Sequence, residues 1–516
     1  MSEKLAKLKE ILGEVSDLGH AGAVLSWDQQ VNMPPSGGEA RGQQLATLGK
    51  IAQEKFTSDE VGNLLEDLKK EFSDPETDEG AMVRVAARGY DKAKRVPASF
   101  VAEQAMAATK ALEAWVEARS KSDFSIFRPY LEKNVELVKK YVSFFPPADH
   151  PYDTLLDDYE PGMKTAEVRE IFGNLRPKQV ALIKAISESK QVKDDFLHKA
   201  FNEKKVWDFS EKIVTKFGYD FNRGRQDKAP HPFQTTFSLN DVRITNRYEK
   251  NAPLATLFSA MHECGHALYE LGCNPEYERT ALQGGTSLAV HESQSRMWEN
   301  LVGRSMPFWE HFYPELKKTF PSQLDGVSVK NFYKAVNKVE PSFIRVNADE
   351  ATYNMHIMLR LEIEIGMVDG SIAVKDLPEI WNEKMRDYLG VTPPNDAQGV
   401  LQDIHWSYGS IGYFSTYALG NIVSAQLWER INKDIKDLED QIRKGQLAEL
   451  REWLREKIHV YGHKYDPQDI VQKVTGSKID SAAYVRYLTK KYSEVYRLSF
   501  YLTPGTPSNL GVSSLH

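Results

Sequence analysis

The sequence predicts a mainly α-helical fold, and two observations support this prediction. Apolar residues recur at helical spacing along most of the 516-residue chain, with no repeat of fixed period. The breaks between these segments are short and contain Pro, Gly, Asn or Asp, as in FFPPADHP and VTPPNDAQG. We therefore expect residues 1–502 to form a single helical unit, which could have two lobes, and residues 503–516 to form a poorly ordered tail.

The helices are expected in the following order. Leu5, Leu8 and the apolar residues that follow them mark one face of a first helix. Thr57 and Glu60 have the spacing of a capping box, which predicts that the next helix begins there. Residues 102–118 are rich in Ala, Glu, Lys and Met, which are good helix formers. Further helices are expected at residues 166–190, 254–271, 286–302, 348–366, 419–444, 447–460 and 481–498.

One segment has the period of a β-strand instead. In the run DVRITNRY, the polar residues Asp241, Arg243 and Thr245 alternate with Val, Ile and Asn. The run QTTF precedes it along the chain. Together these runs predict a small antiparallel hairpin within residues 231–248, directly before the helix that is expected next.

Charge and composition argue against several classes of function. The formal net charge is −7 and the pI is about 6.1, so the surface has no general attraction for nucleic acid or anionic lipid. We find no run of about 18 uncharged apolar residues that could span a membrane, and no apolar core of a signal peptide. Two cysteines, Cys264 and Cys273, are too few for a disulfide framework and suit a reducing compartment. We therefore expect a cytoplasmic protein that binds neither nucleic acid nor membranes.

A metal-binding motif, HECGH, lies in the helix expected at 254–271. His262 and His266 are four residues apart, so their side chains lie one turn apart on the same helix face. Two imidazoles in this geometry can bind one zinc ion, while Glu263 can act as the general base without binding the metal. The alternative is a pair of histidines packed on a buried helix, with Glu263 as a solvated charge.

A catalytic zinc also needs a third protein ligand and an open coordination position. No histidine follows the motif at the metzincin spacing, so we expect a carboxylate from a neighbouring helix. Glu292 is the first candidate, and Glu270 and Glu299 are the alternatives. If Glu292 is not a ligand, it would form an ordinary helix-surface pair with Arg296.

The chain resembles the carboxypeptidase Taq family of zinc metallocarboxypeptidases over essentially its full length. Besides HECGH, five motifs occur in the family order: HPF (231–233), DVRIT (241–245), HESQ (291–294), IRVNAD (344–349) and GVLQDIHW (399–406). The resemblance implies that His262, His266 and Glu292 are the zinc ligands and that Glu263 is the base. It also implies a mostly helical fold with a deep groove, a small sheet at the edge of the groove, and a homodimer.

Further residues are candidates for contact with the substrate, and the resemblance supports the first of them, Arg345. Arg345 would bind the terminal carboxylate of a peptide, because a planar guanidinium can bind a carboxylate through two hydrogen bonds. The alternative is a structural pair between Arg345 and Asp349. His405 would donate a hydrogen bond to the scissile carbonyl or the oxyanion. Tyr413 and Tyr417 are further donors, unless they only pack in the core.

The predicted strand would lie at the edge of the substrate groove, where an extended peptide could pair with it. Asp241, Arg243 and Thr245 would then share a face that contacts substrate, with His231 lining the same groove. The alternatives are an ion-paired strand face and a histidine that merely caps the start of the strand.

The predicted function is therefore removal of single amino acids from the C-terminus of peptides by a zinc-activated water. Co²⁺ or Mn²⁺ could replace Zn²⁺ at such ligands. One alternative is an oligoendopeptidase or a dipeptidyl carboxypeptidase with the same zinc site. The other is a catalytically silent protein that binds metal or peptide, and the presence of Glu263 counts against it.

Overall fold

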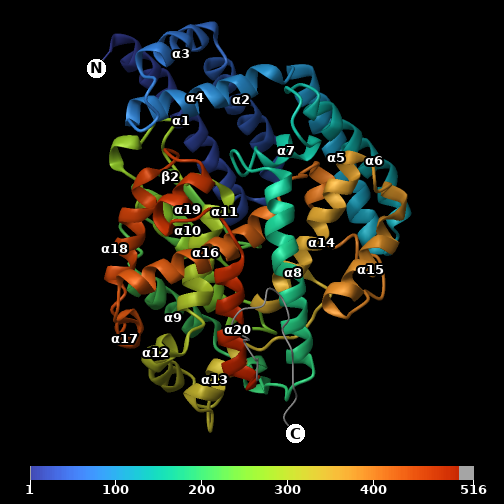
Figure 1. Cartoon of the computed structure of the whole chain (residues 1–516), viewed down its shortest axis with the longest axis vertical. Coiled ribbons are helices and arrows are strands. Elements are labelled where there is room, and N and C mark those ends of the chain that lie inside the picture. The colour runs from blue at the N-terminus through green and yellow to red at the C-terminus, as the bar shows by residue number, and fades with distance from the viewer. Residues whose placement is uncertain (1, 499–516) are drawn as a thin grey trace. The chain divides into compact units, whose positions relative to one another are not determined.

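The structure is a computed structural model that describes residues 2–498. The described part of the chain is mainly helical (Figure 1) and includes a three-stranded sheet, which confirms the predicted fold class. Its residues form two compact units, which we describe separately. None of the described helices is both long enough and apolar enough to cross a membrane. The predicted tail, 503–516, lies outside the described residues, and the single domain over 1–502 stays a prediction.

The first unit contains Met1–Lys94, Asp194–Tyr333 and Leu427–Gly476. Its helices are α1 (Glu3–Val31), α2 (Gly38–Phe56), α3 (Asp59–Glu71), α4 (Asp78–Arg95), α9 (Glu203–Phe217), α10 (Ala255–Leu271), α11 (Leu288–Arg296), α12 (Met306–Thr319), α17 (Leu438–Arg443), α18 (Ala448–Lys457) and α19 (Pro467–Thr475). The second unit has α5 (Ala98–Lys121), α6 (Phe124–Val142), α7 (Pro151–Leu156), α8 (Thr165–Ser187), α14 (Glu350–Asp369), α15 (Leu377–Leu389) and α20 (Ala482–Tyr496). Arg95, the last residue of α4, belongs to the second unit, and α13 (Val329–Val336) and α16 (Ser415–Asp434) have residues in both units.

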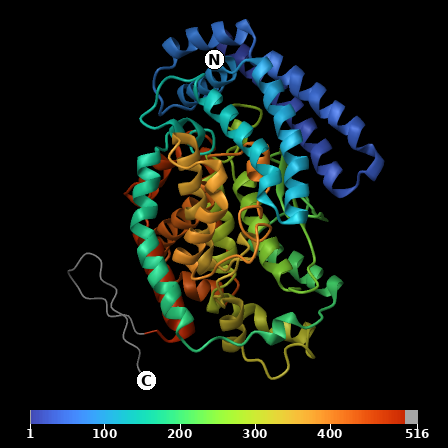
Figure 2. The ribbon, with the colours of Figure 1, turned by 90° about the vertical axis from the view of Figure 1, so that its right-hand side faces the viewer.

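The N-terminal helices of the first unit share a hydrophobic core with four residues from later in the chain: Leu239, Cys273, Tyr277 and Leu282. Leu5 and Leu8 of α1 pack with Val61 and Leu65 of α3 and with Met82 of α4. The burial of Leu5 and Leu8 confirms the predicted face of the first helix. Helices α1 and α2 lie side by side (Figure 2).

The helix cap expected at Thr57 is wrong by one residue. Helix α3 begins at Asp59, and the hydroxyl of Ser58 accepts a hydrogen bond from the Val61 amide at 3.4 Å. Thr57 instead ends α2, and its hydroxyl donates to the Gln53 carbonyl at 2.8 Å. Ser and Thr both favour the N-cap position, so residue type alone could not show which of the two begins α3.

The sheet contains the predicted hairpin and one strand that was not predicted. Strands β2 (Gln234–Ser238) and β3 (Asp241–Asn246) pair antiparallel. Strand β1 (Gln226–Lys228) pairs parallel with β3, so the sheet is mixed, in the order β1-β3-β2, and not purely antiparallel. β1 is three residues long and polar, which leaves no alternation to detect. Helix α10 packs against β2 and β3.

Two predicted helices differ from the structure in their C-terminal parts. The helix expected at 286–302 is α11 up to Arg296, followed by a π-helical turn at Met297–Val302. π-Helical turns occur often at functional sites. The helix expected at 419–444 is two helices, α16 and α17, which Ile435–Asp437 separate.

The second unit is organised around α14. Almost every residue of this helix is buried, and α8 packs against α14, α15 and α20 (Figure 2). Helices α5 and α6 pack against each other, and α6 also contacts α14. Some of its buried polar side chains are hydrogen-bonded, such as Glu364, which accepts from the Tyr152 hydroxyl and the Trp406 indole.

Candidate metal centre

Helices α10 and α11 of the first unit pack in close contact at Gly265, which lies between the two histidines of the motif. A Cβ atom at Gly265 would lie 2.5 Å from the Ser295 Cα and 2.6 Å from the Gln294 carbonyl oxygen. Any side chain at this position would therefore push α11 away. The glycine thus brings Glu292 of α11 within reach of the histidines of α10.

The side chains of His262, His266 and Glu292 converge, with one candidate ligand atom of each within 4.8 Å of the others. The Glu292 Oε2 atom is 3.5 Å from His262 Nε2 and 3.3 Å from His266 Nε2. Tetrahedral zinc with bonds of about 2.0–2.1 Å requires ligand atoms roughly 3.4 Å apart. The three residues therefore fit a zinc ion.

Polar neighbours hold two of these side chains by their other atoms. Arg296 Nε donates to Glu292 Oε1 at 2.7 Å. His262 Nδ1 is 2.9 Å from Glu299 Oε2, and Arg304 Nη2 donates to Glu299 Oε1 at 3.2 Å. Glu299, an alternative ligand in the sequence analysis, thus contacts the far side of the His262 ring.

Glu270, the other alternative ligand, is also turned away from the three converging atoms. Its Oε1 atom lies 2.8 Å from His291 Nε2. Among the described residues, His262, His266 and Glu292 form the one group of at least three His, Cys, Asp or Glu that could hold a metal ion.

The pKa values of these groups reflect their burial and their charged neighbours. Although burial raises it, Arg296 and the two histidines keep the pKa of Glu292 well below its usual value. Although burial lowers it, Glu292 and Glu299 raise the pKa of His262 above its usual value. Burial lowers the pKa of His266 to about 4. The site therefore favours an ionised Glu292 and a neutral His266, which are the forms that bind metal.

Glu263 follows the first histidine and is 7% exposed. Burial, reinforced by Glu292 and Glu299, raises the pKa of Glu263 to about 7. A carboxyl with a pKa near neutrality can both accept and return a proton, as a general base requires. A bound cation would favour the ionised form of Glu263.

The structure groups four of the other predicted residues in the second unit. Arg345 lies 5.2 Å from the Tyr417 ring centre, the Tyr417 hydroxyl is 3.4 Å from that of Tyr413, and the His405 and Tyr413 rings are 5.4 Å apart. The grouping spans 72 positions of sequence, from Arg345 to Tyr417. It therefore depends on the tertiary fold of this unit.

Arg345 is 5% exposed and pairs with Asp403 rather than with Asp349. Its Nε and Nη2 atoms donate to Asp403 Oδ1 at 3.1 and 2.7 Å, and Nη1 donates to the Tyr353 hydroxyl at 3.0 Å. Asp349 instead caps α14. Arg360 binds the second oxygen of Asp403 at 2.5 and 2.8 Å, so two guanidinium groups share one carboxylate.

His405 lies beside this pair of arginines. Its Nδ1 atom is 3.9 Å from Asp403 Oδ1, which is too far for a hydrogen bond. Burial, reinforced by Arg345 and Arg360, lowers the pKa of His405 to about 4. The ring is therefore neutral at pH 7 and carries one N–H that can donate.

The remaining predicted residues, Asp241, Arg243, Thr245 and His231, lie in or beside the sheet of the first unit. Arg243 forms two hydrogen bonds with Asp241, at 2.7 and 2.8 Å, and its guanidinium stacks on the Trp27 ring at 4.5 Å. Thr245 is fully buried, and its hydroxyl accepts from the Phe233 amide at 2.9 Å. His231 is exposed. Substrate contact by Asp241, Arg243 and His231 stays a prediction.

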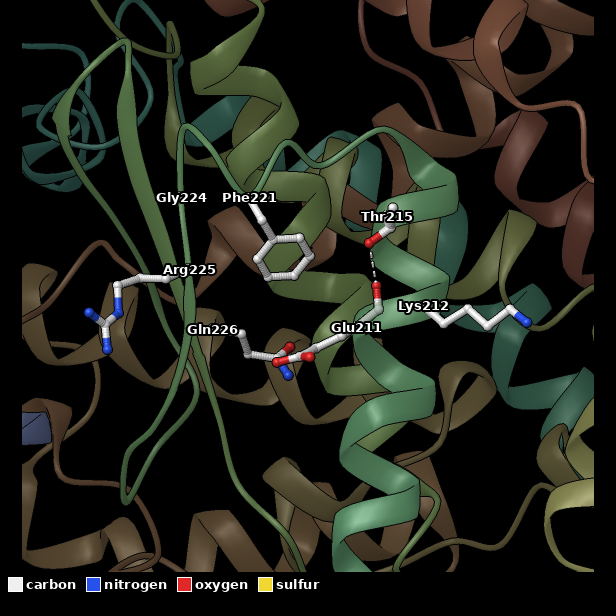
Figure 3. Close-up of a pocket in the computed structure, with 7 residues that line it drawn as sticks. All are labelled: Glu211, Lys212, Thr215, Phe221, Gly224, Arg225 and Gln226. Carbon is white, nitrogen blue, oxygen red and sulfur yellow. Dashed lines mark hydrogen bonds between the residues drawn. The ribbon is translucent and has the colours of Figure 1, made fainter.

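A surface hollow of about 570 Å³ lies beside α9 in the first unit (Figure 3). It is lined by Glu211, Lys212, Thr215, Phe221, Gly224, Arg225 and Gln226, none of which was predicted as a site residue. Lys212 pairs with Glu315, Arg225 pairs with Asp227, and Glu211 accepts from the Trp207 indole. In Figure 3 the side chains of Lys212 and Arg225 point to opposite sides, so they do not converge on a ligand.

The sequence analysis did not identify two residues that lie next to the candidate ligands and their hydrogen-bond partners. His291 contacts His266, and Arg304 contacts Glu299. His291 stands next to Glu292 in the HESQ motif, and this adjacency was the available signal. The contact itself depends on how α10 and α11 cross.

An HExxH helix whose two histidines meet a glutamate of a following helix defines a class of helical metallopeptidases. Residues 7–492 match the carboxypeptidase Taq (M32) metallopeptidase family. The chain is 41% identical to thermostable carboxypeptidase 1 of Pyrococcus furiosus over 493 residues, which cover 94% of this chain and 98% of that protein. It is 37% identical to carboxypeptidase 1 of Bacillus subtilis over 490 residues, covering 95% and 98% of the two chains.

The fold agrees with these similarities. The solved structure of the M32 carboxypeptidase from Deinococcus radiodurans R1 matches with a TM-score of 0.93 and 38% identity, over 96% of this chain and all of that one. The chain belongs to the carboxypeptidase Taq (M32) family, which confirms the resemblance seen in its motifs. It is therefore an enzyme of the metallocarboxypeptidase class, with a metal cofactor.

Proposed function

We propose that the protein is a zinc carboxypeptidase that removes single amino acids from the C-terminus of peptides. The observation that carries this proposal is the convergence of His262, His266 and Glu292, in which Glu292 Oε2 lies 3.5 and 3.3 Å from the two imidazoles, with Glu263 next to His262 in the chain. Two imidazoles and one carboxylate are a ligand set that zinc uses in catalytic sites. Co²⁺ and Mn²⁺ accept the same nitrogen and oxygen ligands, so they are expected to substitute.

When bound, zinc lowers the pKa of a water and polarises the carbonyl of the scissile peptide bond. Glu263 would accept the proton of the attacking water through its carboxylate. The protonated Glu263 would then donate that proton to the leaving amine nitrogen. The raised pKa of Glu263, about 7, supports both steps.

Arg345 is our candidate for the group that makes the enzyme an exopeptidase. Arg345 and Arg360 share Asp403, so one positive charge of the cluster is not balanced by this carboxylate. A surplus positive charge attracts the terminal carboxylate of a peptide. The IRVNAD motif supports the same role through the family resemblance.

The developing oxyanion would accept hydrogen bonds from this chain. His405 is the first candidate, because its neutral ring can donate without losing a charge. Tyr413 and Tyr417 are the further candidates, and each carries a hydroxyl donor. Asp241, Arg243 and His231 are proposed to contact the peptide along the sheet, as in the DVRIT and HPF motifs of the family. The fully buried Thr245, whose hydroxyl accepts from the Phe233 amide, would support β3 from within and would not touch the peptide.

The test is to incubate purified protein with a peptide that has a free C-terminus, with the same peptide amidated at its C-terminus, and with a blocked dipeptide. Products are identified by mass, with and without a chelator. Stepwise loss of single residues from the free peptide, abolished by chelator and restored by zinc or cobalt, is expected. Dipeptide products indicate a dipeptidyl carboxypeptidase, internal fragments indicate an oligoendopeptidase, and no cleavage by zinc-loaded protein overturns the proposal.

Two other expectations come from the resemblance and the composition. We propose a homodimer, for which light scattering should give twice the 58.7 kDa mass of the chain. A cytoplasmic location stays a prediction, and cell fractionation with an antibody would test it.

A further inference from the structure

The two histidines of the candidate metal site are supported in different ways. His262 Nδ1 lies 2.9 Å from a carboxylate oxygen, that of Glu299. His266 Nδ1 lies 2.6 Å from Nδ1 of His291, a second imidazole. The other nitrogen of His291, Nε2, lies 2.8 Å from Glu270 Oε1. Each histidine is therefore linked to a carboxylate through its Nδ1 atom. Glu299 contacts His262 directly, whereas Glu270 reaches His266 only through the His291 ring.

The positions of the protons in this chain follow from the hydrogen-bonding capacity of each group. An ionised Glu270 can only accept, so His291 Nε2 must carry the hydrogen. The Nδ1 atom of a neutral His291 is then an acceptor, so the hydrogen between the two rings belongs to His266 Nδ1. His266 Nε2 is thus left with a free lone pair, and this is the atom that lies 3.3 Å from Glu292.

The surrounding backbone fixes the His291 ring and the Glu270 carboxylate. The Gly285 amide donates to Glu270 Oε1 at 3.2 Å. A Cβ atom at Gly285 would lie 2.6 Å from His291 Cδ2, so a larger residue there would displace the ring. The Tyr269 ring also packs against the His291 ring, with their centroids 5.0 Å apart. Glu270 is 8% exposed, which shields its hydrogen bond from water.

We propose that Glu270 and His291 are positioning residues for the metal, which hold His266 in the tautomer and orientation that present Nε2. This inference rests on the proposed metal-binding role of His266. Groups that fix the second nitrogen of a histidine ligand commonly change metal affinity 10–100-fold. Because Glu270 is separated from His266 by the His291 ring, whereas Glu299 contacts His262 directly, the loss of the Glu270 charge should weaken metal binding less than the same loss at Glu299.

The experiment measures the zinc affinity of the full-length protein by competition with a chromophoric chelator. His291→Leu should bind zinc about 10–100-fold more weakly than the wild type, because it leaves His266 Nδ1 without an acceptor. His291→Asn should recover part of this loss, because its Oδ1 atom can stand in the place of Nδ1 and accept. Glu270→Gln should weaken binding, though by less than Glu299→Gln. Glu276→Gln, an exposed residue beyond the end of α10, is the matched control and should bind as the wild type does.

A purely structural role would give a different pattern. It would lower the melting temperature of the metal-free protein, measured in excess chelator, and leave zinc affinity unchanged. The inference is overturned if His291→Leu and Glu270→Gln bind zinc with wild-type affinity, or if His291→Asn binds no better than His291→Leu. His266→Ala separates this failure from that of the proposed function, since wild-type zinc affinity in His266→Ala would refute the metal site itself.

Discussion

The two units of the molecule each contain a buried cluster of charged side chains, and the two clusters have opposite surplus charge. In the first unit, the cluster contains four carboxyl groups, Glu263, Glu270, Glu292 and Glu299, around His262, His266 and His291. Two of them, Glu292 and Glu299, pair with Arg296, and Glu299 also pairs with Arg304. In the second unit, Arg345 and Arg360 share Asp403. Because unbalanced charge is costly away from water, the sign of the surplus charge determines which kind of ion each buried cluster favours.

The difference indicates what each cluster is suited to bind. The acidic surplus of the first cluster is reduced when a divalent cation binds. The basic surplus of the second is reduced when an anion such as a carboxylate binds. The pKa values follow the same division: that of Glu263 is raised to about 7, whereas that of Asp403, although burial raises it, is held low by Arg360 and Arg345.

The largest expected effect comes from Glu263→Gln, which removes the proposed general base from the acidic cluster. Activity should fall about 10²–10⁴-fold, because Gln cannot accept the proton. Zinc affinity should stay within a few-fold of the wild type, since Glu263 is not one of the converging ligands. Peptidase assays and zinc titration measure the two quantities. Substantial activity in zinc-loaded Glu263→Gln would contradict the assignment.

Removing the shared carboxylate would break the basic cluster. Asp403→Ala leaves two buried guanidinium groups without their partner, which should cost about 3–5 kcal/mol of unfolding free energy. Urea unfolding of the chelated protein measures this loss. Glu117→Ala, which removes an exposed partner of Lys121 in the same unit, is the control and should have a far smaller effect. Equal losses in the two variants would show that the cluster is not charged as we describe it.

The pH dependence of stability tests whether burial and the nearby arginines keep His405 neutral. Its folded-state pKa, about 4, lies below the ordinary value of 6.5. The unfolded state therefore binds more protons in this range, and stability is full above pH 6.5 and falls as the pH drops toward 4. At pH 5 the loss from this group should be about 2 kcal/mol. Unfolding of the chelated wild type and His405→Gln at pH 7.5 and pH 5 would measure it, and the same pH slope in both would contradict the account.

A helix cap outside both clusters gives the scale of an ordinary local contact. Ser58→Ala should lower the unfolding free energy by about 1 kcal/mol, because the Val61 amide loses its acceptor. Thr57→Ala, one residue earlier, should have a smaller effect, since Thr57 does not cap α3. A larger loss for Thr57→Ala would restore the cap expected from the sequence.

Local spacing carried most of what could be predicted about the metal site. His262 and His266 are on one helix four residues apart, so their convergence follows from helix geometry alone. Glu292 required a motif and a neighbouring helix as well. Its place beside the histidines depends on Gly265, whose effect on the packing of α10 against α11 cannot be read from spacing.

The contacts that were missed are those between residues far apart in the sequence. Arg345 pairs with Asp403, 58 positions away, whereas spacing suggested Asp349. Similarly, His266 meets His291 across 25 positions. The fold class was predictable because helical periodicity extends over long segments. Strand β1 was not, because three polar residues have no pattern until β3 pairs with them.

The central claim is that His262, His266 and Glu292 together hold one zinc ion beside Glu263. X-ray absorption at the zinc edge of the loaded wild type, compared with Glu292→Gln, tests it most directly. We predict one zinc per chain with only nitrogen and oxygen ligands at about 2.0–2.2 Å, and weakened binding in the variant. Sulfur ligands, or wild-type occupancy and an unchanged spectrum in Glu292→Gln, would contradict the account.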